Sequence, residues 1–249
     1  MATVEITQLT PRTYSPTQRG IPSAEAPLHE AAVAAAEILA PPGCEHLIVI
    51  PELDVGGMRP DLWIGYFDDE QFRIRVEAGL EACTAPYPLS VAYELRRLGG
   101  ACSIEQLCSP ARRLGERRRV LRGLAELVER GFVERDQRSV ILNAAWAPAS
   151  ARGVGVEAKV GRWRKAVRQV QMSGAFLNGA WLVFPDSYLP HFPRGEQALR
   201  HLGIGVVQDG ALRVVRKPRL RCGRDARRVL LEEHLYARWR AELMTVSNK

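Results

Sequence analysis

Apolar residues recur along this chain at two spacings, and the change from one spacing to the other divides the sequence. Residues 28–39, "LHEAAVAAAEIL", have the alanine content and the apolar spacing of a helix. Short apolar runs bounded by turn residues follow it, and they predict strands at 45–53, 59–67 and 72–80. The opening part of the chain therefore predicts one helix and then three strands.

Helical spacing returns in the middle of the chain. Leu, Val and Tyr at intervals of three and four residues predict helices at 87–100, 102–113 and 115–132, and two short strands around a turn follow at 133–143. Three helices and a β hairpin are the order of a winged helix-turn-helix. Residues 124–135, "LAELVERGFVER", resemble the end of the third helix and the entry to the wing in such proteins.

An α/β pattern resumes after residue 150. It predicts a strand, a basic amphipathic helix, a strand, a short helix, a hairpin with "QDG" at its turn, and a helix in the basic tail; these segments are 153–160, 161–178, 179–186, 195–203, 204–217 and 219–243. We therefore expect a Pro/Thr/Ser-rich, poorly ordered segment at 1–27, a discontinuous α/β core at 28–85 and 151–249, and an inserted winged helix at 86–150.

Composition and charge narrow the class of protein. A chain of 249 residues with 46% hydrophobic residues can bury one large core or two small ones, and we expect two units. The sequence has no apolar run of transmembrane length and no signal-peptide pattern at its start, so we expect a cytoplasmic protein without a membrane partner. The five cysteines lack CxxC or finger spacing, which argues against structural zinc and disulfides.

The net charge of +7 is unevenly distributed. Residues 1–85 carry 13 acidic and 5 basic side chains, whereas every later part of the chain is basic. Such a division suits a protein that holds a polyanion on one surface and a cation in a carboxylate-lined site, although an arginine-rich composition alone produces a basic body as well.

Two acidic residues and a lysine stand where they can meet. Glu157 and Lys159 are two residues apart on a predicted strand, so their side chains point to one face, and Asp61 begins an earlier strand after Pro60. Carboxylate oxygens suit Mg²⁺ or Mn²⁺, and a lysine can position a water molecule or stabilise charge on a phosphate. The alternative is a surface ion pair between Glu157 and Lys159.

Pro60-Asp61 and Glu157-Ala158-Lys159, in this order of strands and helices, resemble the PD-(D/E)XK (restriction-endonuclease-like) nuclease superfamily over residues 28–85 and 151–217. The resemblance implies a restriction-endonuclease-like mixed sheet flanked by helices. It also implies Mg²⁺-dependent hydrolysis of DNA, with Asp61 and Glu157 as metal ligands and Lys159 as the catalytic lysine.

The resemblance implies further site residues. An acid from the first helix often joins the site, and Glu30 or Glu37 fits that place, with Glu30 preferred because it is near the helix start. Gln169 matches a glutamine common in the helix after the lysine. Glu77 in "RVEAGL" is the competing second acid, but Gly79 stands where its lysine would be.

Basic residues in two segments are the predicted contacts to DNA. They are Arg117, Arg118, Arg119 and Arg122 in the third helix of the middle segment, Arg135 and Arg138 in the wing, and Arg162, Arg164, Lys165 and Arg168 after the lysine strand. Two other functions stay open. One is a non-catalytic DNA-binding regulator, and the other is a nuclease subunit, possible also as a homodimer, whose winged helix docks a protein partner in a defence, recombination or repair complex.

Overall fold

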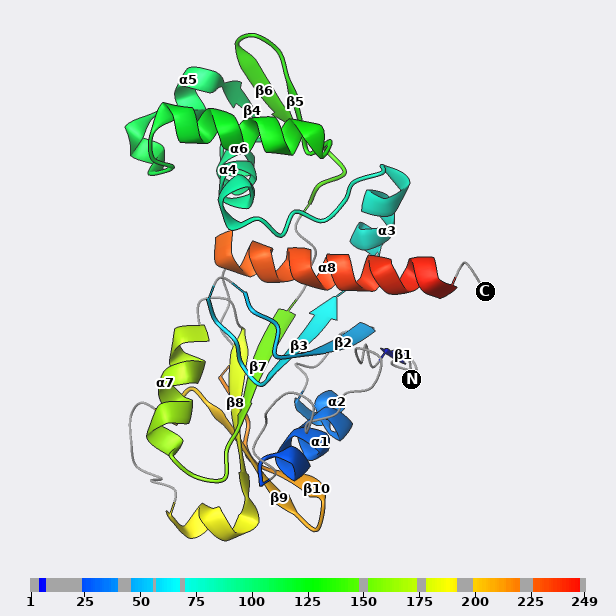
Figure 1. The fold of residues 1–249 in the computed structure, drawn as a ribbon, viewed down its shortest axis with the longest axis vertical. Helices are drawn as coiled ribbons and strands as arrows, with labels where there is room; N and C mark the ends of the chain where they lie inside the picture. The colour runs from blue at the N-terminus through cyan, green and yellow to red at the C-terminus, as the bar shows by residue number, and fades with distance from the viewer. Residues whose placement is uncertain are drawn as a thin grey trace. The chain divides into compact units, whose positions relative to one another are not determined.

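The structure is a computed structural model, and the residues that it describes are 5–7, 24–39, 46–55, 57–67, 70–147, 152–173, 178–191, 199–219 and 226–246. The chain forms two compact units (Figure 1). Unit 1 consists of Met1–Phe67 and Ala151–Gly223, and unit 2 consists of Asp68–Ser150 and Arg224–Lys249. Within the described ranges, no helix is both long and apolar enough to cross a membrane.

Unit 1 is an α/β structure built on a mixed sheet of seven strands in the order β1-β2-β3-β7-β8-β9-β10. The strands are β1 (Glu5–Thr7), β2 (His46–Pro51), β3 (Leu62–Phe67), β7 (Arg152–Ala158), β8 (Gly179–Pro185), β9 (Gly203–Gln208) and β10 (Ala211–Arg216). Strands β2, β3 and β7 form an antiparallel meander, whereas β7, β8 and β9 are parallel. The outer strands differ, because β1 pairs parallel to β2 and β10 antiparallel to β9.

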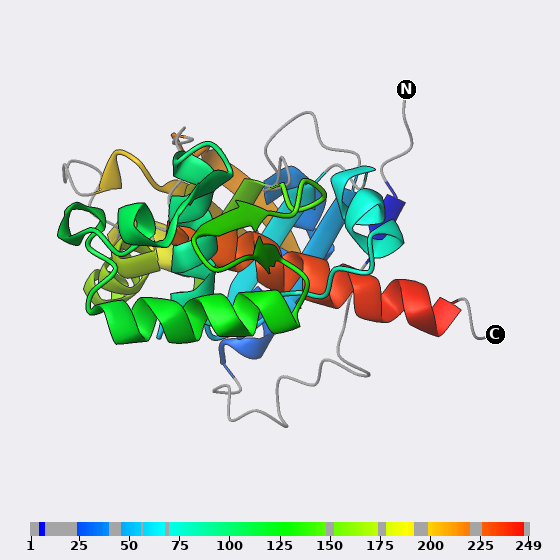
Figure 2. The same cartoon turned by 90° about the horizontal axis from the view of Figure 1, so that it is seen from above.

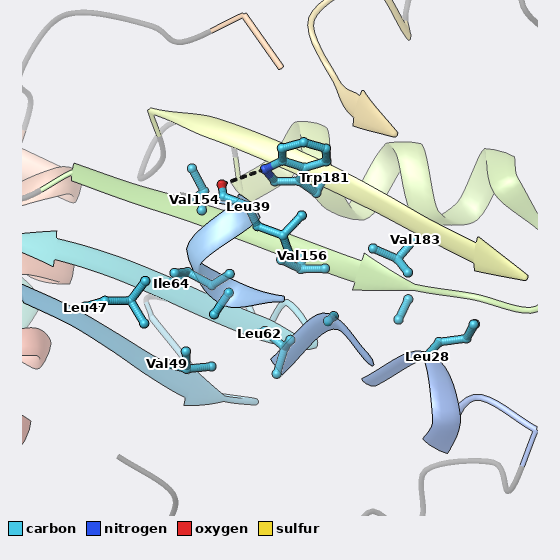
Figure 3. Close-up of a cluster of buried hydrophobic side chains, with 13 residues drawn as sticks. Leu28, Leu39, Leu47, Val49, Leu62, Ile64, Val154, Val156, Trp181 and Val183 are labelled. Carbon is cyan, nitrogen blue, oxygen red and sulfur yellow. Dashed lines mark hydrogen bonds between the residues drawn. The ribbon is translucent and has the colours of Figure 1, made fainter. Parts of the chain in front are cut away.

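Helices cover both faces of this sheet. Helices α1 (Ala26–Ala34) and α2 (Ala36–Leu39) lie on one face and α7 (Trp163–Ser173) on the other (Figures 1 and 3). Figure 3 shows the core under α1 and α2, where Leu28 and Leu39 pack among the strand residues Val154 and Val156. The indole Nε1 of Trp181 donates a hydrogen bond to the Leu39 carbonyl at 3.0 Å, which fixes the end of α2 to β8.

Unit 2 combines helices with a small antiparallel sheet of order β4-β6-β5. Its elements are α3 (Glu70–Glu77), α4 (Pro86–Arg97), β4 (Ala101–Ser103), α5 (Ile104–Leu107), the 3₁₀ turn η2 (Pro110–Arg112), α6 (Arg117–Glu129), β5 (Val133–Arg135), β6 (Ser139–Leu142) and α8 (Ala226–Val246). Helix α6 and the small sheet lie side by side in both views (Figures 1 and 2). Helices α4 and α6 approach closely at Gly123, where a Cβ would stand 3.1 Å from the Tyr87 ring.

A buried ion pair ties α8 to the rest of unit 2. The guanidinium of Arg75 on α3 donates to both oxygens of Glu233 on α8, at 2.9 and 2.8 Å. Glu233 also accepts from the backbone N of Cys83 at 2.7 Å and from Trp146 Nε1 at 3.0 Å. One carboxylate therefore holds three separate segments of unit 2 together.

The strand predicted at 72–80 is wrong, because these residues form helix α3 and a following turn. Phe72 and Arg75, three residues apart, are both buried, whereas Ile74, an inward position of the predicted strand, is 40% exposed. The third strand of the meander is instead β7, which follows the first segment of unit 2, Asp68–Ser150, in the sequence. Unit boundaries also differ from the expected ones, since residues 68–85 and 224–249 belong to unit 2.

Most of the remaining predicted elements are confirmed where the structure describes them. The single helix expected at 102–113 is wrong, because these residues form the end of β4, the four-residue helix α5 and the 3₁₀ turn η2. The helix expected at 28–39 is interrupted at Ala35, which separates α1 from α2. The hairpin at 204–217 turns through Asp209 and Gly210, both with positive φ, as in a type I′ turn. Of the short helix expected at 195–203, residues 195–198 lie outside the described residues and Gly203 begins β9. Most of the segment 1–27 also lies outside the described residues, although 5–7 form β1 and Ala26 begins α1.

Candidate functional site

The predicted site residues of β3 and β7 meet because these strands are neighbours in the sheet. Leu62 pairs with Val156, so Asp61, which precedes Leu62, lies beside the end of β7. The Asp61 Oδ2 atom accepts a hydrogen bond from the backbone N of Ala158 at 2.7 Å and another from Lys159 Nζ at 2.8 Å. One oxygen atom of Asp61 thus binds two groups at the end of β7, although Asp61 and these residues are far apart in the sequence.

Lys159 is the centre of this cluster. Its Nζ atom lies 2.8 Å from Asp61 Oδ2 and 3.6 Å from an oxygen of Glu157 and of Glu25, and its side chain is 16% exposed. Its backbone N donates to the carbonyl of Val183 on β8 at 2.9 Å, which fixes the residue at the end of β7. Burial alone would lower the pKa of Lys159, but Asp61, Glu157 and Glu25 together raise it, so the ammonium stays charged.

Glu157 is the most buried carboxyl group of the site, with 1% of its side chain exposed. Burial, and then the negative charge of Asp61, raise its pKa to about 9, and the attraction of Lys159 offsets only part of this. Glu157 therefore keeps its proton to a higher pH than an exposed glutamate does. Neither carboxyl oxygen of Glu157 has a hydrogen-bond partner among the described residues. A buried carboxyl group without such partners is costly, and this is typical of a group kept for a ligand.

The first helix contributes Glu25 and His29, which the sequence analysis did not single out. Glu25 is the N-cap residue of α1, and His29, four residues later, lies on the same face of the helix. The His29 Nε2 atom is 3.7 Å from Asp61 Oδ2, and its side chain is 1% exposed. Burial lowers the pKa of His29 against the attraction of Asp61, so its imidazole is neutral. Glu30 and Glu37, the predicted acids, are instead exposed.

A local signal for this arrangement exists in the sequence. Pro27 is favoured in the first turn of a helix, so it marks Ala26 as the start of α1 and Glu25 as the residue that precedes the helix. Once the helix is known to begin at Ala26, the spacing of four residues between Glu25 and His29 places both side chains on one face. A helix that is expected to start at Leu28 does not include Glu25.

The basic residues after Lys159 lie at the surface of unit 1. Arg162 precedes α7 with a φ of 50°, and Arg164, Lys165 and Arg168 are exposed along α7. Their helix buries Ala166, Val167 and Val170. Gln169 is half-buried on the same helix, which packs against β7 and β8. The predicted amphipathic helix is confirmed, with its basic residues in solvent.

The six predicted arginines of unit 2 are all exposed; they are Arg117, Arg118, Arg119, Arg122, Arg135 and Arg138. Two of them have partners within unit 2. The Arg119 guanidinium lies 4.1 Å from the centre of the Tyr87 ring, and Arg117 is 3.6 Å from Glu105. Arg118 and Arg122 are one helical turn apart and share an exposed face of α6.

The carboxyl oxygens of Asp61 and Glu157 are the type of ligand that a hard divalent ion prefers. In the part of the chain that the structure describes, no three His, Cys, Asp or Glu side chains are arranged to hold a metal, since the acids surround Lys159 Nζ instead. Mg²⁺ needs only one or two carboxylates and keeps several waters. Asp61 and Glu157 are the two carboxyl groups that could supply such oxygens, and Glu157 would release its proton on binding the ion.

The three described cysteines are free thiols that are buried or half-buried. Cys83 is buried, and Cys102 and Cys108 are half-buried. Burial raises the pKa of the Cys83 thiol to about 11, so it is not a nucleophile at neutral pH. Cys44 and Cys222 lie outside the described residues.

Comparisons of the chain with profiles of known families, with curated proteins and with solved structures give no match, so the geometry of the site carries the functional argument.

Proposed function

We propose that this protein is a metal-dependent DNA endonuclease of the PD-(D/E)XK type. The observation that carries the proposal is the convergence of Asp61, Glu157 and Lys159 at the ends of two adjacent strands. The order of elements in unit 1 adds support, because α1, the meander β2-β3-β7, α7 and the parallel strand β8 follow the arrangement that the resemblance implies.

Each residue of the site has a role in this proposal. Asp61 and Glu157 would hold Mg²⁺ or Mn²⁺, and the ion would supply Lewis acidity to the scissile phosphate. Lys159, kept charged by its acidic neighbours, orients the attacking water and stabilises negative charge that develops on the phosphate. Glu25 restrains the Lys159 ammonium from the side of α1, at 3.6 Å.

Unit 2 is the proposed duplex-binding part of the chain. Its elements α4, β4, α5, α6, β5 and β6 follow the order of a winged helix, with α6 as the third helix and β5-β6 as the wing. The exposed arginines of α6 and of the wing would neutralise phosphates or contact base edges. Direct contact predicts binding of naked duplex DNA that weakens steeply as salt concentration rises.

The test is metal-dependent cleavage of supercoiled and linear DNA by the wild-type protein and by Glu157→Ala and Lys159→Ala. Lys217→Ala is the matched control, because Lys217 is an exposed lysine of unit 1. We expect cutting that needs Mg²⁺ or Mn²⁺, falls by on the order of 10²–10³-fold in both site variants, and persists in the control.

DNA binding measured in EDTA separates the other functions. Binding without cutting by the wild-type protein would overturn the nuclease and favour a non-catalytic regulator. A wild-type protein that does not bind naked duplex would instead point to a protein partner for unit 2.

A further inference from the structure

Aromatic side chains lie at the end of the sheet where β7 leads into Lys159. The 3₁₀ segment η3 (Asp186–His191) follows β8 directly, and Val183 of β8 accepts the hydrogen bond from the Lys159 backbone. A Cβ on Gly161, two residues after Lys159, would stand 4.0 Å from Cε2 of Tyr188. The Tyr188 ring therefore lies against the loop that leaves the lysine.

The Tyr188 ring is held in place by its neighbours. Its centre is 5.2 Å from that of Phe184, with the planes inclined by 30°, and 6.2 Å from that of His191. The start of η3 is fixed to β10 by an ion pair between Asp186 and Arg213 at 3.0 Å. Tyr188 is half-buried and His191 is exposed, so part of this aromatic pair faces solvent.

The surface around these rings combines apolar and cationic groups. Val160, the residue after Lys159, is 41% exposed, and Arg162 is exposed with a left-handed φ of 50°. A non-glycine residue in that region is strained, and such strain is concentrated at functional sites. Aromatic rings for a base and guanidinium groups for phosphates are the combination that binds single-stranded nucleic acid.

We propose that Tyr188, with His191 beside it, stacks on an unpaired base next to the phosphate that is attacked at Asp61, Glu157 and Lys159. This inference rests on the proposed nuclease function. Inside an intact duplex both faces of a base are covered by its neighbours, so a protein ring can stack on it once the base has left the stack or the step has been opened. The substrate class is therefore DNA with unpaired nucleotides at the cut, and Tyr188 is a positioning residue.

Binding without cleavage provides the first test. In EDTA, a single-stranded oligonucleotide that contains 2-aminopurine and a hairpin-closed duplex are titrated with wild-type protein, Tyr188→Phe and Tyr188→Leu. Leucine keeps apolar bulk against Gly161 and Phe184 but cannot stack. We expect Tyr188→Leu to weaken single-strand binding and its fluorescence quenching by about 5- to 150-fold, Tyr188→Phe to match the wild type, and duplex binding to stay unchanged.

Cleavage of a splayed fork and of a full duplex of the same sequence provides the second test. We expect the wild-type protein to prefer the fork in Mg²⁺ and Tyr188→Leu to lose that preference while it still cuts the duplex. Preference of the wild type for the duplex, or equal single-strand binding by Tyr188→Leu, would overturn this inference alone. A wild-type protein that cuts no DNA would overturn the nuclease proposal, and this inference with it.

Discussion

Glu233 holds unit 2 together, and replacing it tests how much of the stability of that unit depends on one carboxylate. The Glu233→Gln variant keeps the shape of the side chain but removes the charge that faces Arg75, and both side chains are at most 2% exposed. Both oxygens of Glu233 accept hydrogen bonds, from Arg75, Cys83 and Trp146. In the variant, one of these oxygens becomes an amide NH₂, which is itself a donor and cannot accept them. Breaking a buried pair in this way costs about 3–5 kcal/mol.

That cost is a large part of the total stability of a domain, about 5–15 kcal/mol. Hydrogen exchange measured by mass spectrometry reports it for unit 2 separately, from peptides of α4 and α6. With about 1.4 kcal/mol for each factor of ten, a cost of about 3–5 kcal/mol should lower protection in these helices by on the order of 10²–10⁴-fold. Peptides of β7 and β8 in unit 1 should keep their protection.

The control is Glu134→Gln, because Glu134 is exposed on β5 and its loss should leave protection within a few fold. The paired replacement Arg75→Met with Glu233→Leu removes both charges and should regain part of the lost protection, since no charge is left buried alone. A change of less than tenfold in Glu233→Gln would show that the ion pair does not hold α3 and α8 together.

Three further outcomes can be measured. Gly203→Ala should destabilise unit 1 by about 1–3 kcal/mol or more in urea unfolding, because its Cβ would stand 2.5 Å from two atoms of the Trp181 ring; unchanged stability would contradict this packing. In EDTA, stability should decrease as the pH rises from about 4.5 to about 9, because folded protein keeps a proton on Glu157 that the unfolded chain has released, and Glu157→Gln should remove this slope in urea unfolding at several pH values. Arg118→Ala and Arg122→Ala should each lower the salt slope of duplex binding by about 0.9, and an unchanged slope would exclude these side chains from phosphate contact.

The fold could be predicted where local spacing reports a local environment. The amphipathic helix after Lys159 and the hairpin around Asp209 and Gly210 both follow from such patterns. The segment 72–80 could not be predicted in this way, because its alternation of apolar and charged residues suits a strand as well as a short helix. In the helix, Phe72 and Arg75 share one buried face, and Arg75 pairs there with Glu233, a residue that is distant in the sequence and that no local pattern reports.

The residues of the candidate site also fall into those that local sequence patterns predict and those that they do not. Asp61, Glu157 and Lys159 could be proposed from residue type and spacing, and the structure brings them together. The contribution of Glu25 and His29 could not be proposed in this way, because it depends on the residue at which α1 begins. A helix that starts at Ala26 places Glu25 and His29 toward β3 and β7, whereas Glu30 is turned to solvent.

The long insertion between the two parts of the site has a simple physical explanation. Strand β3 runs from Leu62, next to Asp61, to Phe67, and β7 runs antiparallel from Arg152 back to the site. The chain therefore leaves unit 1 after β3 and re-enters it at β7, at the strand ends opposite the site. The six residues of β3, at roughly 3.3 Å each, place these ends about 20 Å from the site. The ladder between β3 and β7 fixes Asp61 against Glu157, so the length of chain between Phe67 and Arg152 does not affect the geometry at Lys159. Insertions at that end of the sheet can vary in size and function, whereas a shift of one residue in the β3–β7 register would turn Glu157 to the other face and abolish the site.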